Sequence, residues 1–173
     1  MKDTFDENTL GSLKKKKINS RTKGNRFENK IANILNERFG TQDFCRSPGS
    51  GAFATTHKLP EHMKVHGDLI TPKSFRFSIE CKKGYNKEKL GDIFNPSSIL
   101  SNMITQACKD SRKSSKEFLL IIGQDRKDPL EITDANVDGR NMKQYLAGWI
   151  YNNSITVATL KHILELDDSF FKM

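Results

Sequence analysis

The run EFLLIIG, residues 117–123, constrains the fold of this chain more than any other segment. An apolar run of this length between Glu and Gly is typical of a strand that is covered on both faces. The segment FRFSIECK, residues 75–82, instead alternates apolar and polar residues and predicts a strand with two unlike faces. Together with the helices predicted around them, these strands indicate an α/β layer with a mixed central sheet.

The helix predicted at residues 22–39 is the most strongly indicated element. Its apolar residues recur at helical spacing, and Gly40 follows as a stop signal. A second helix is expected to begin at Asn95 and Pro96, a favourable pair for a helix start. The predicted core is αβββαβ, with its elements at residues 22–39, 42–47, 67–70, 75–82, 95–113 and 117–123.

The length of 173 residues suits one domain with an adequate core. Residues 1–20 are polar and aperiodic and predict a flexible basic arm, whereas 21–173 predict a single domain with its core at 21–123. The additions expected within 124–173 are irregular chain, a helical turn, a hairpin about Asn152 and Asn153, and a short closing helix, at residues 128–141, 142–147, 148–160 and 160–166.

The charge of the chain indicates a polyanionic partner. There are 29 Lys and Arg against 21 Asp and Glu, a formal net charge of +8, which favours nucleic acid over an acidic membrane. The lysine run Lys14–Lys17 fits either a solvated tail or a phosphate contact that ignores sequence. The sequence has neither an apolar run of membrane-spanning length nor the apolar segment of a signal peptide, so we expect a cytoplasmic protein.

Glu28 is placed unusually for a carboxylate. On a helical wheel it falls between Leu35 and Phe39, inside the apolar arc of the first helix. Arg38 falls near the end of the same arc, where a long side chain can reach out to solvent. Glu28 is too short to do this, so it is expected to need a partner, a metal ion or a polar cavity.

Two further carboxylates flank the strand at 75–82. Asp68 and Glu80 are separated by enough chain for a strand, a turn and a strand, which would bring them together as oxygen ligands for Mg²⁺. Lys82 shares a strand face with Glu80, about 6 to 7 Å along it. At that distance it would orient a water or neutralise a phosphorane oxygen, and would be too far to cap the carboxylate fully as a simple ion pair. The alternative is a Gly-Asp turn beside an ordinary solvated strand face.

The segment CRSPGSG after the second predicted element is a backbone-permissive turn. Arg46 and Ser50 on this turn would present a cation, a hydroxyl and backbone amides to a phosphate. Residues 52–66 follow as an expected exposed loop with three histidines. A zinc site, exposed loop side chains and substrate contact are all open for them, and His66 is the best placed because Gly67 and Asp68 come next.

These residues together resemble the PD-(D/E)xK nuclease superfamily. More narrowly, RTKGNRFENKIANIL, FCRSPGSG, GDLI and FSIECKK are similar to the archaeal-type Holliday junction resolvase family. That family has a K-G-x-x-x-E helix start, an R-S-x-G-S loop and a strand ending in I-E-x-K. The resemblance covers residues 21–123 and implies a restriction-endonuclease-like core. The chain departs from the pattern by about fifteen extra residues before Gly67, and by Gly67 itself in place of a proline.

The resemblance implies a role for each matching position. Glu28, Asp68 and Glu80 would serve the metal site with the backbone carbonyl of Cys81, and Lys82 would assist the water. Ser50 would be needed for strand cleavage. The residues expected to contact DNA are Lys23, Arg46, Gly49, Ser50, Gly51, His66, Lys83, Gln106 and Lys109.

The resemblance also implies Mg²⁺ dependence, with Mn²⁺ as a substitute, a homodimer, and paired nicks in four-way DNA junctions at the nucleoid. The leading hypothesis is therefore a structure-selective DNA endonuclease of the Holliday junction resolvase kind. Another repair or restriction-type nuclease of the superfamily is the first alternative. A basic module that binds nucleic acid without cutting it is the second.

Overall fold

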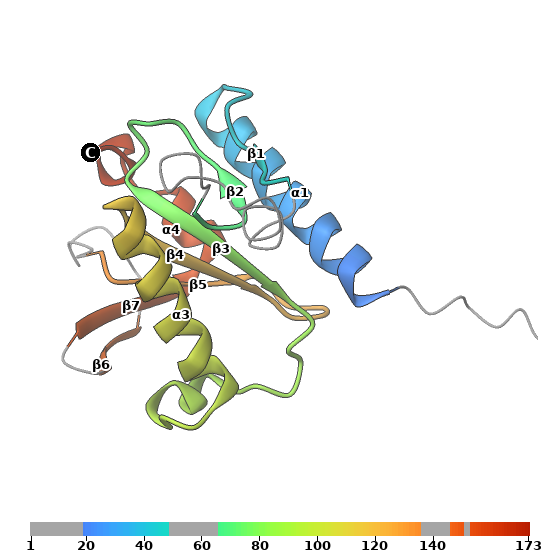
Figure 1. The fold of residues 1–173 in the computed structure, drawn as a ribbon, viewed down its shortest axis with the longest axis vertical. Coiled ribbons are helices and arrows are strands. Elements are labelled where there is room, and N and C mark those ends of the chain that lie inside the picture. Colours follow the sequence, from blue (N-terminus) through green and yellow to red (C-terminus); the bar gives the residue numbers. More distant parts are fainter. Residues whose placement is uncertain (1–18, 49–65, 136–145, 151–152) are drawn as a thin grey trace, which may run out of the picture.

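The computed structural model describes residues 19–48, 66–135, 146–150 and 153–173 (Figure 1). Within them the predicted order of the core is confirmed. Its elements are α1 (Ser20–Phe39), β1 (Cys45–Arg46), β2 (Leu69–Ile70), β3 (Phe77–Lys83), α3 (Ile99–Ser114) and β4 (Glu117–Gly123). The predicted arm at 1–20 lies outside the described residues except at its last two positions, where Asn19 caps α1 and Ser20 begins it.

The central sheet has five strands in the order β3-β4-β5-β7-β6. Strands β3 and β4 are parallel, and every other neighbouring pair is antiparallel, so the sheet is mixed, as expected. Strands β1 and β2 form a separate antiparallel pair. The strands added after the core are β5 (Leu130–Thr133), β6 (Leu146–Ile150) and β7 (Asn153–Thr159).

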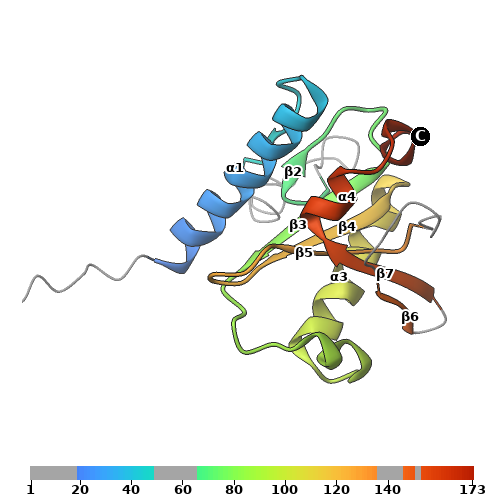
Figure 2. The same ribbon diagram turned by 180° about the vertical axis from the view of Figure 1, so that it is seen from behind.

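Helices cover the sheet on both faces (Figures 1 and 2). Helix α3 packs on one face, over Leu120 and Ile122 of β4. Helix α1 and the short α4 (Leu160–Leu164) pack on the other, over Ile121. The apolar character of β4 is thereby explained, because successive side chains of a strand enter opposite cores.

Four details of the sequence prediction are corrected. Strand β5 lies at Leu130–Thr133, where irregular chain was expected. Helix α3 begins at Ile99 rather than at Asn95, because the 3-10 helix η3 (Leu90–Phe94) precedes it and the Ser98 hydroxyl caps it. The hairpin is confirmed, but Asn153 already pairs with Ile150 and belongs to β7. The helical turn proposed at 142–147 overlaps β6 at its end and otherwise lies outside the described residues.

The closing helix is confirmed as α4, and a second short 3-10 helix, η4 (Asp168–Phe171), follows it. Arg38 at the end of α1 fixes this region, since its guanidinium donates to the carbonyls of Leu164 at 2.6 Å and Leu166 at 3.0 Å. The side chain thus reaches beyond the core edge, as predicted. None of the helices in the described ranges is both long and apolar enough to cross a lipid bilayer.

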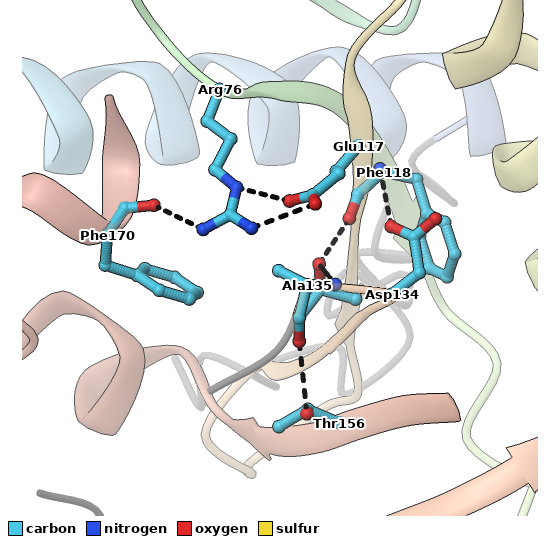
Figure 3. Close-up of polar contacts among 8 residues, drawn as sticks. Arg76, Glu117, Phe118, Asp134, Ala135, Thr156 and Phe170 are labelled. Atoms are coloured by element: carbon cyan, nitrogen blue, oxygen red, sulfur yellow. Dashed lines mark hydrogen bonds and ion pairs between the residues drawn. The ribbon is translucent and has the colours of Figure 1, made fainter. Parts of the chain in front are cut away.

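Figure 3 shows the polar contacts that attach the added strands to the core. The Thr133 hydroxyl donates to the Phe118 carbonyl at 2.7 Å, and Asp134 accepts the Phe118 amide at 3.1 Å. Nearby, Arg76 is paired with Glu117 and donates to the Phe170 carbonyl at 3.3 Å. The start of β4 is therefore tied both to the end of β5 and to η4, which makes the additions part of one sheet system.

Candidate active site

The candidate site lies along the outer edge of β3, the first strand in the order of the central sheet. Asp68, just before β2, joins this edge through its backbone, whose amide donates to the Ile79 carbonyl at 2.7 Å. Its carboxylate accepts the Cys81 amide at 2.8 Å. Asp68 also accepts the Ser47 amide on its own carbonyl at 2.8 Å. Three backbone hydrogen bonds thus fix a buried carboxylate in the plane of the sheet.

Gly67 is required for this placement. Its φ is +87°, and a Cβ at this position would stand 2.5 Å from the Ile79 carbonyl oxygen. Proline fixes φ near −65° and any L side chain would clash. The glycine that stands where the superfamily has a proline is therefore a consequence of how closely the chain approaches β3 here.

Glu28 reaches the site from α1. The side chain is 8% exposed, so the prediction of burial from the helical wheel is confirmed. Its partner is Arg46 of β1, whose Nε lies 2.6 Å from the carboxylate. Asn36 positions β1 for this contact, because its amide donates to the Phe44 carbonyl at 2.8 Å and accepts the Phe44 amide at 3.0 Å.

Glu80 and Lys82 stand on the other face of β3. The alternation predicted for this strand is confirmed, since Ile79 and Cys81 enter the core beneath α1 while Glu80 and Lys82 point toward α3. One expectation is wrong: the Lys82 ammonium is not too far to cap Glu80 but forms an ion pair with it. Backbone spacing did not reveal this, because the four-carbon stem of lysine folds back over the distance between the two residues.

Burial has the largest effect on the carboxylates of this edge, and the charge of Asp68 adds to it. Burial, followed by the charge of Asp68, raises the pKa of Glu28 even though Arg46 opposes the shift. Burial and Asp68 likewise raise the pKa of Glu80 against the effect of Lys82. Arg46 and Lys82 therefore do not fully offset the effects of burial and of the neighbouring carboxylates. A bound cation would favour the ionised form of both glutamates.

The pKa of Lys82 is raised. Burial alone would lower it, but the hydrogen bond to Glu80 and the charges of Glu80 and Asp68 outweigh burial. Lys82 is therefore an ammonium at neutral pH. In contrast, burial and the same carboxylates raise the pKa of the Cys81 thiol well above its usual range, so Cys81 is no thiolate nucleophile here.

The donor set suits a hard divalent cation. In the described part of the chain, no group of three or more His, Cys, Asp and Glu side chains is arranged to hold a metal. Asp68 and Glu80, however, supply two buried carboxylates on one edge. The Cys81 carbonyl points to the same edge as its amide, which donates to Asp68. Two carboxylates and a carbonyl, completed by water, fit the chemistry of Mg²⁺. Glu28, held by Arg46, is the outer member of the expected set.

The remaining predicted DNA contacts are distributed around this edge. Lys83 points to the α1 face, where its ammonium lies 2.8 Å from Asp125 and over the ring of Phe27. Lys23 is exposed on α1, and its charge contributes to the lowered pKa of Asp125, after the hydrogen bonds from Lys83 and Asn86. His66 is half-buried, and its carbonyl accepts the Ser78 hydroxyl at 3.3 Å.

Gln106 and Lys109 are exposed on α3. Asp110 was not among the predicted site residues, yet its charge contributes to the raised pKa of Glu80, after burial, Asp68 and the opposing effect of Lys82. Asp110 is four residues beyond Gln106, so the two lie along the same side of α3. This spacing was the available signal. Gly49, Ser50, Gly51 and the loop at 52–65 lie outside the described residues.

Comparison with known proteins gives three findings. The sequence model of a family described as "Phage putative PDDEXK endonuclease" matches residues 19–166. Protein D14 of Escherichia phage T5 is 32% identical over 114 residues, which are 63% of this chain and 67% of that protein. Among solved structures, the Holliday junction resolvase Hjc of Archaeoglobus fulgidus aligns over 86% of this chain and 91% of its own, with 13% identity and a TM-score of 0.35.

Proposed function

Because the chain belongs to the phage PDDEXK endonuclease family, and is thus a nuclease of the PD-(D/E)xK superfamily, we propose that it hydrolyses phosphodiester bonds in DNA with the help of a divalent metal ion. The observation that carries this proposal is the edge of β3, where Asp68 and Glu80 are both buried, the charge of Asp68 acts on Glu80, and Lys82 is paired with Glu80. The substrate that we propose is a four-way DNA junction, which makes the protein a Holliday junction resolvase.

The proposed metal is Mg²⁺, with Mn²⁺ as a substitute. Asp68, Glu80 and the Cys81 carbonyl would hold it, and Glu28 would support them from α1. When bound, such an ion lowers the pKa of water and polarises the phosphate. It would also offset the charge of Asp68, which adds to burial in raising the pKa values of Glu28 and Glu80.

Lys82 has the main role among the cations of the chain. As an ammonium, it donates a hydrogen bond to the Glu80 carboxylate, which holds it at the acidic edge. It would orient the attacking water and stabilise the negative charge that develops on the phosphate oxygens. Arg46 stands beside Glu28 on the opposite face of the strand, where we propose that it contacts a flanking phosphate, together with Lys23 on α1.

The preference for junctions is supported by the motifs that frame the site. The K-G-x-x-x-E start of α1, the R-S-x-G-S loop and the I-E-x-K end of β3 are those of the archaeal-type resolvases. Ser50 of that loop is proposed to act in strand cleavage. Gln106 and Lys109 are proposed to follow the DNA along α3. A second chain would be needed for the paired nicks of a resolvase, so we propose a homodimer.

Cleavage assays test the proposal directly. Purified protein is incubated with a labelled four-way junction, a linear duplex of the same sequence and a flap, each with Mg²⁺ and with EDTA. We expect cutting of the junction in Mg²⁺ and none in EDTA. Asp68→Asn and Lys82→Gln are each expected to lower the rate at least about 100-fold, the scale of a lost catalytic group. Both should retain DNA binding in a gel-shift assay.

The matched control is Lys161→Gln, which removes an exposed lysine of α4 and with it the same charge as Lys82→Gln. It should cut like the original chain. If linear duplex is cut as fast as the junction, the protein is a PD-(D/E)xK nuclease of another substrate class. If the junction is bound but stays intact in Mg²⁺ and Mn²⁺, the chain is a non-catalytic binding module and the proposal is wrong.

A further inference from the structure

A cavity lies near the candidate active site, on the α3 face of the sheet. Its volume is about 580 Å³, which is within the usual range for small-molecule sites. It lies where β4 ends and β5 begins, beneath the segment that leads from β3 to α3. Ile122 of β4 is part of its floor and is the ladder partner of Lys82 on β3. Neighbouring strands are about 4.8 Å apart, so the cavity opens one strand away from the proposed catalytic lysine.

The floor and the rim of this cavity differ in chemistry. Leu100 of α3 and two sheet residues, Ile122 and Ile132, form an apolar floor where α3 meets the sheet. The rim carries three exposed lysines and two acids, namely Lys87, Lys89, Lys127, Glu88 and Asp128. An apolar floor accepts a flat ring, and a net positive rim favours an anionic group beside it. A nucleotide combines both features.

Gln124 gives the cavity a fixed shape. This buried side chain donates to the carbonyl of Tyr85 at 2.8 Å and to that of Glu88 at 2.9 Å. Its own carbonyl accepts the Lys127 ammonium at 2.9 Å. One amide thus holds the segment after β3 in place and aims one of the rim lysines. The wall and the rim are therefore organised before any ligand arrives.

We propose that this cavity is a nucleotide subsite, which receives the base of a nucleotide next to the phosphodiester bond that is cut. The base would lie on the apolar floor while the rim lysines contact its flanking phosphates. Extruding a base costs least where it is poorly stacked or unpaired, as at a branch point. The subsite would thus link the choice of a branched substrate to the position of Lys82. This inference rests on the proposed nuclease function and extends it to substrate choice.

The first test detects the extruded base. Junctions carrying 2-aminopurine at each of the three positions on either side of the mapped cut are mixed with Asp68→Asn protein, which should bind without cutting. A 2-aminopurine that leaves the stack becomes more fluorescent. We expect a rise at one or two positions beside the cut, and none at the others.

The second test blocks the cavity. Leu90 lines it and is 36% exposed, so Leu90→Trp adds a ring at the rim with little disturbance of the core. We expect about tenfold weaker junction binding, the scale of one altered apolar contact. An abasic nucleotide at the fluorescent position should abolish that difference, since the base is then missing in both complexes. The control is Phe94→Trp on the same 3-10 helix, because Phe94 is 60% exposed and is not part of the cavity lining.

The outcomes separate this inference from the proposed function. If the original chain cuts junctions but no position fluoresces, or if Leu90→Trp binds like Phe94→Trp, the subsite is wrong and the nuclease stands. If abasic DNA leaves the effect of Leu90→Trp unchanged, the cavity does not read the base and the inference also fails. If the original chain cuts no DNA, the proposed function fails, and with it the subsite.

Discussion

Glu131 of β5 is a buried carboxylate that the candidate site does not use. Both its oxygens are buried without a hydrogen-bond partner. The residue stands opposite Ile121 and Ala158 in the ladders on either side, so its side chain enters the apolar core beneath α1 and α4. Burial raises its pKa well above the usual range. Glu131 is therefore a protonated acid in the folded state, and its burial without a hydrogen-bond partner lowers the stability of the fold.

Glu131→Gln is expected to stabilise the protein at neutral and alkaline pH. Because the folded state keeps its proton to a higher pH than the unfolded state, the original chain loses stability as pH rises from about 4.3, the unfolded pKa, toward the folded value. The variant lacks this loss. Its advantage should grow between pH 5 and pH 8 to about 2 kcal/mol, the scale of a buried polar group left unpaired. Urea unfolding at both pH values measures it.

The exposed Glu165 offers the control. Glu165→Gln should leave the free energy of unfolding unchanged within about 0.5 kcal/mol, as for most surface changes. An advantage of Glu131→Gln that is equal at pH 5 and pH 8 would contradict the assignment of a raised pKa to this residue.

The pair of Glu28 and Arg46 is expected to be coupled. Arg46→Met leaves the buried Glu28 carboxylate beside Asp68 without its cation, and should cost more stability in the original chain than in Glu28→Gln protein. Since the Arg46 side chain is 26% exposed, solvent screens the pair, and we expect a coupling of about 1 to 2 kcal/mol in a double-mutant cycle. Urea unfolding of the four proteins gives the value.

An exposed ion pair serves as the reference for this cycle. Lys172 and Asp168 are 3.8 Å apart with side chains 62% and 50% exposed. Their cycle, with Lys172→Met and Asp168→Asn, should give less than about 0.5 kcal/mol. Equal coupling energies in the two cycles would mean that the buried pair of Glu28 and Arg46 stabilises the protein no more than an exposed ion pair does.

At the scale of elements, the approach of β2 to β3 depends on Gly67. Gly67→Ala is expected to destabilise the protein by about 2 to 3 kcal/mol, because it adds a steric clash to an unfavourable φ. Gly84 has a φ of +102° with nothing within 4 Å of an added Cβ. Gly84→Ala therefore has the unfavourable backbone conformation without a steric clash, and should lower the free energy of unfolding by about 1 kcal/mol.

The difference between the two glycine variants isolates the contact with the Ile79 carbonyl. Gly67→Ala should also reduce Mg²⁺-dependent cleavage more than Gly84→Ala does, since Asp68 is displaced along with its neighbour. The cleavage assay and urea unfolding measure both effects. Equal stability losses would show that Asp68 does not rely on this close approach.

The core elements were predictable because each follows one periodicity. Helix α1 has a clear apolar arc and a glycine stop, β3 alternates, and β4 is apolar throughout. Strand β5 was missed for a physical reason: its four residues include Glu131, which reads as a solvent-facing residue but is buried. The start of α3 was misplaced because Asn95 and Pro96 are a favourable pair for a helix start, whereas residues 95–98 form a turn after η3 and the helix begins at Ile99, capped by Ser98.

The candidate site was predictable where burial decides the outcome. The wheel position of Glu28 implied a buried carboxylate that needs a partner, and Arg46 is that partner. The contact between Lys82 and Glu80 was not predictable, since strand spacing fixes the backbone and not the path of a flexible side chain. The cavity with Ile122 in its floor was not predictable either, because segments that are distant in sequence form it by tertiary packing and no local sequence pattern indicates it.

At the scale of the whole molecule, oligomeric state decides whether the proposed function is complete. Among its described residues the chain has one edge that combines Asp68, Glu80 and Lys82. One such edge suffices to cut one DNA strand. A four-way junction is resolved by two nicks related by two-fold symmetry. A two-fold dimer supplies two such edges in matching orientation. The proposed homodimer is thus a consequence of the substrate.

We expect light scattering to give twice the chain mass of 19.7 kDa, at least when junction DNA is present. On a supercoiled plasmid that extrudes a cruciform, a dimer should make both nicks within one binding event and yield linear DNA with little nicked circle. Mixing active chain with an excess of Asp68→Asn protein should shift the product to nicked circle, because mixed dimers carry one competent edge. A mass of 19.7 kDa on the junction, with nicked circle as the first product at every mixing ratio, would exclude paired cutting by a dimer and leave a nuclease that cuts one strand at a time.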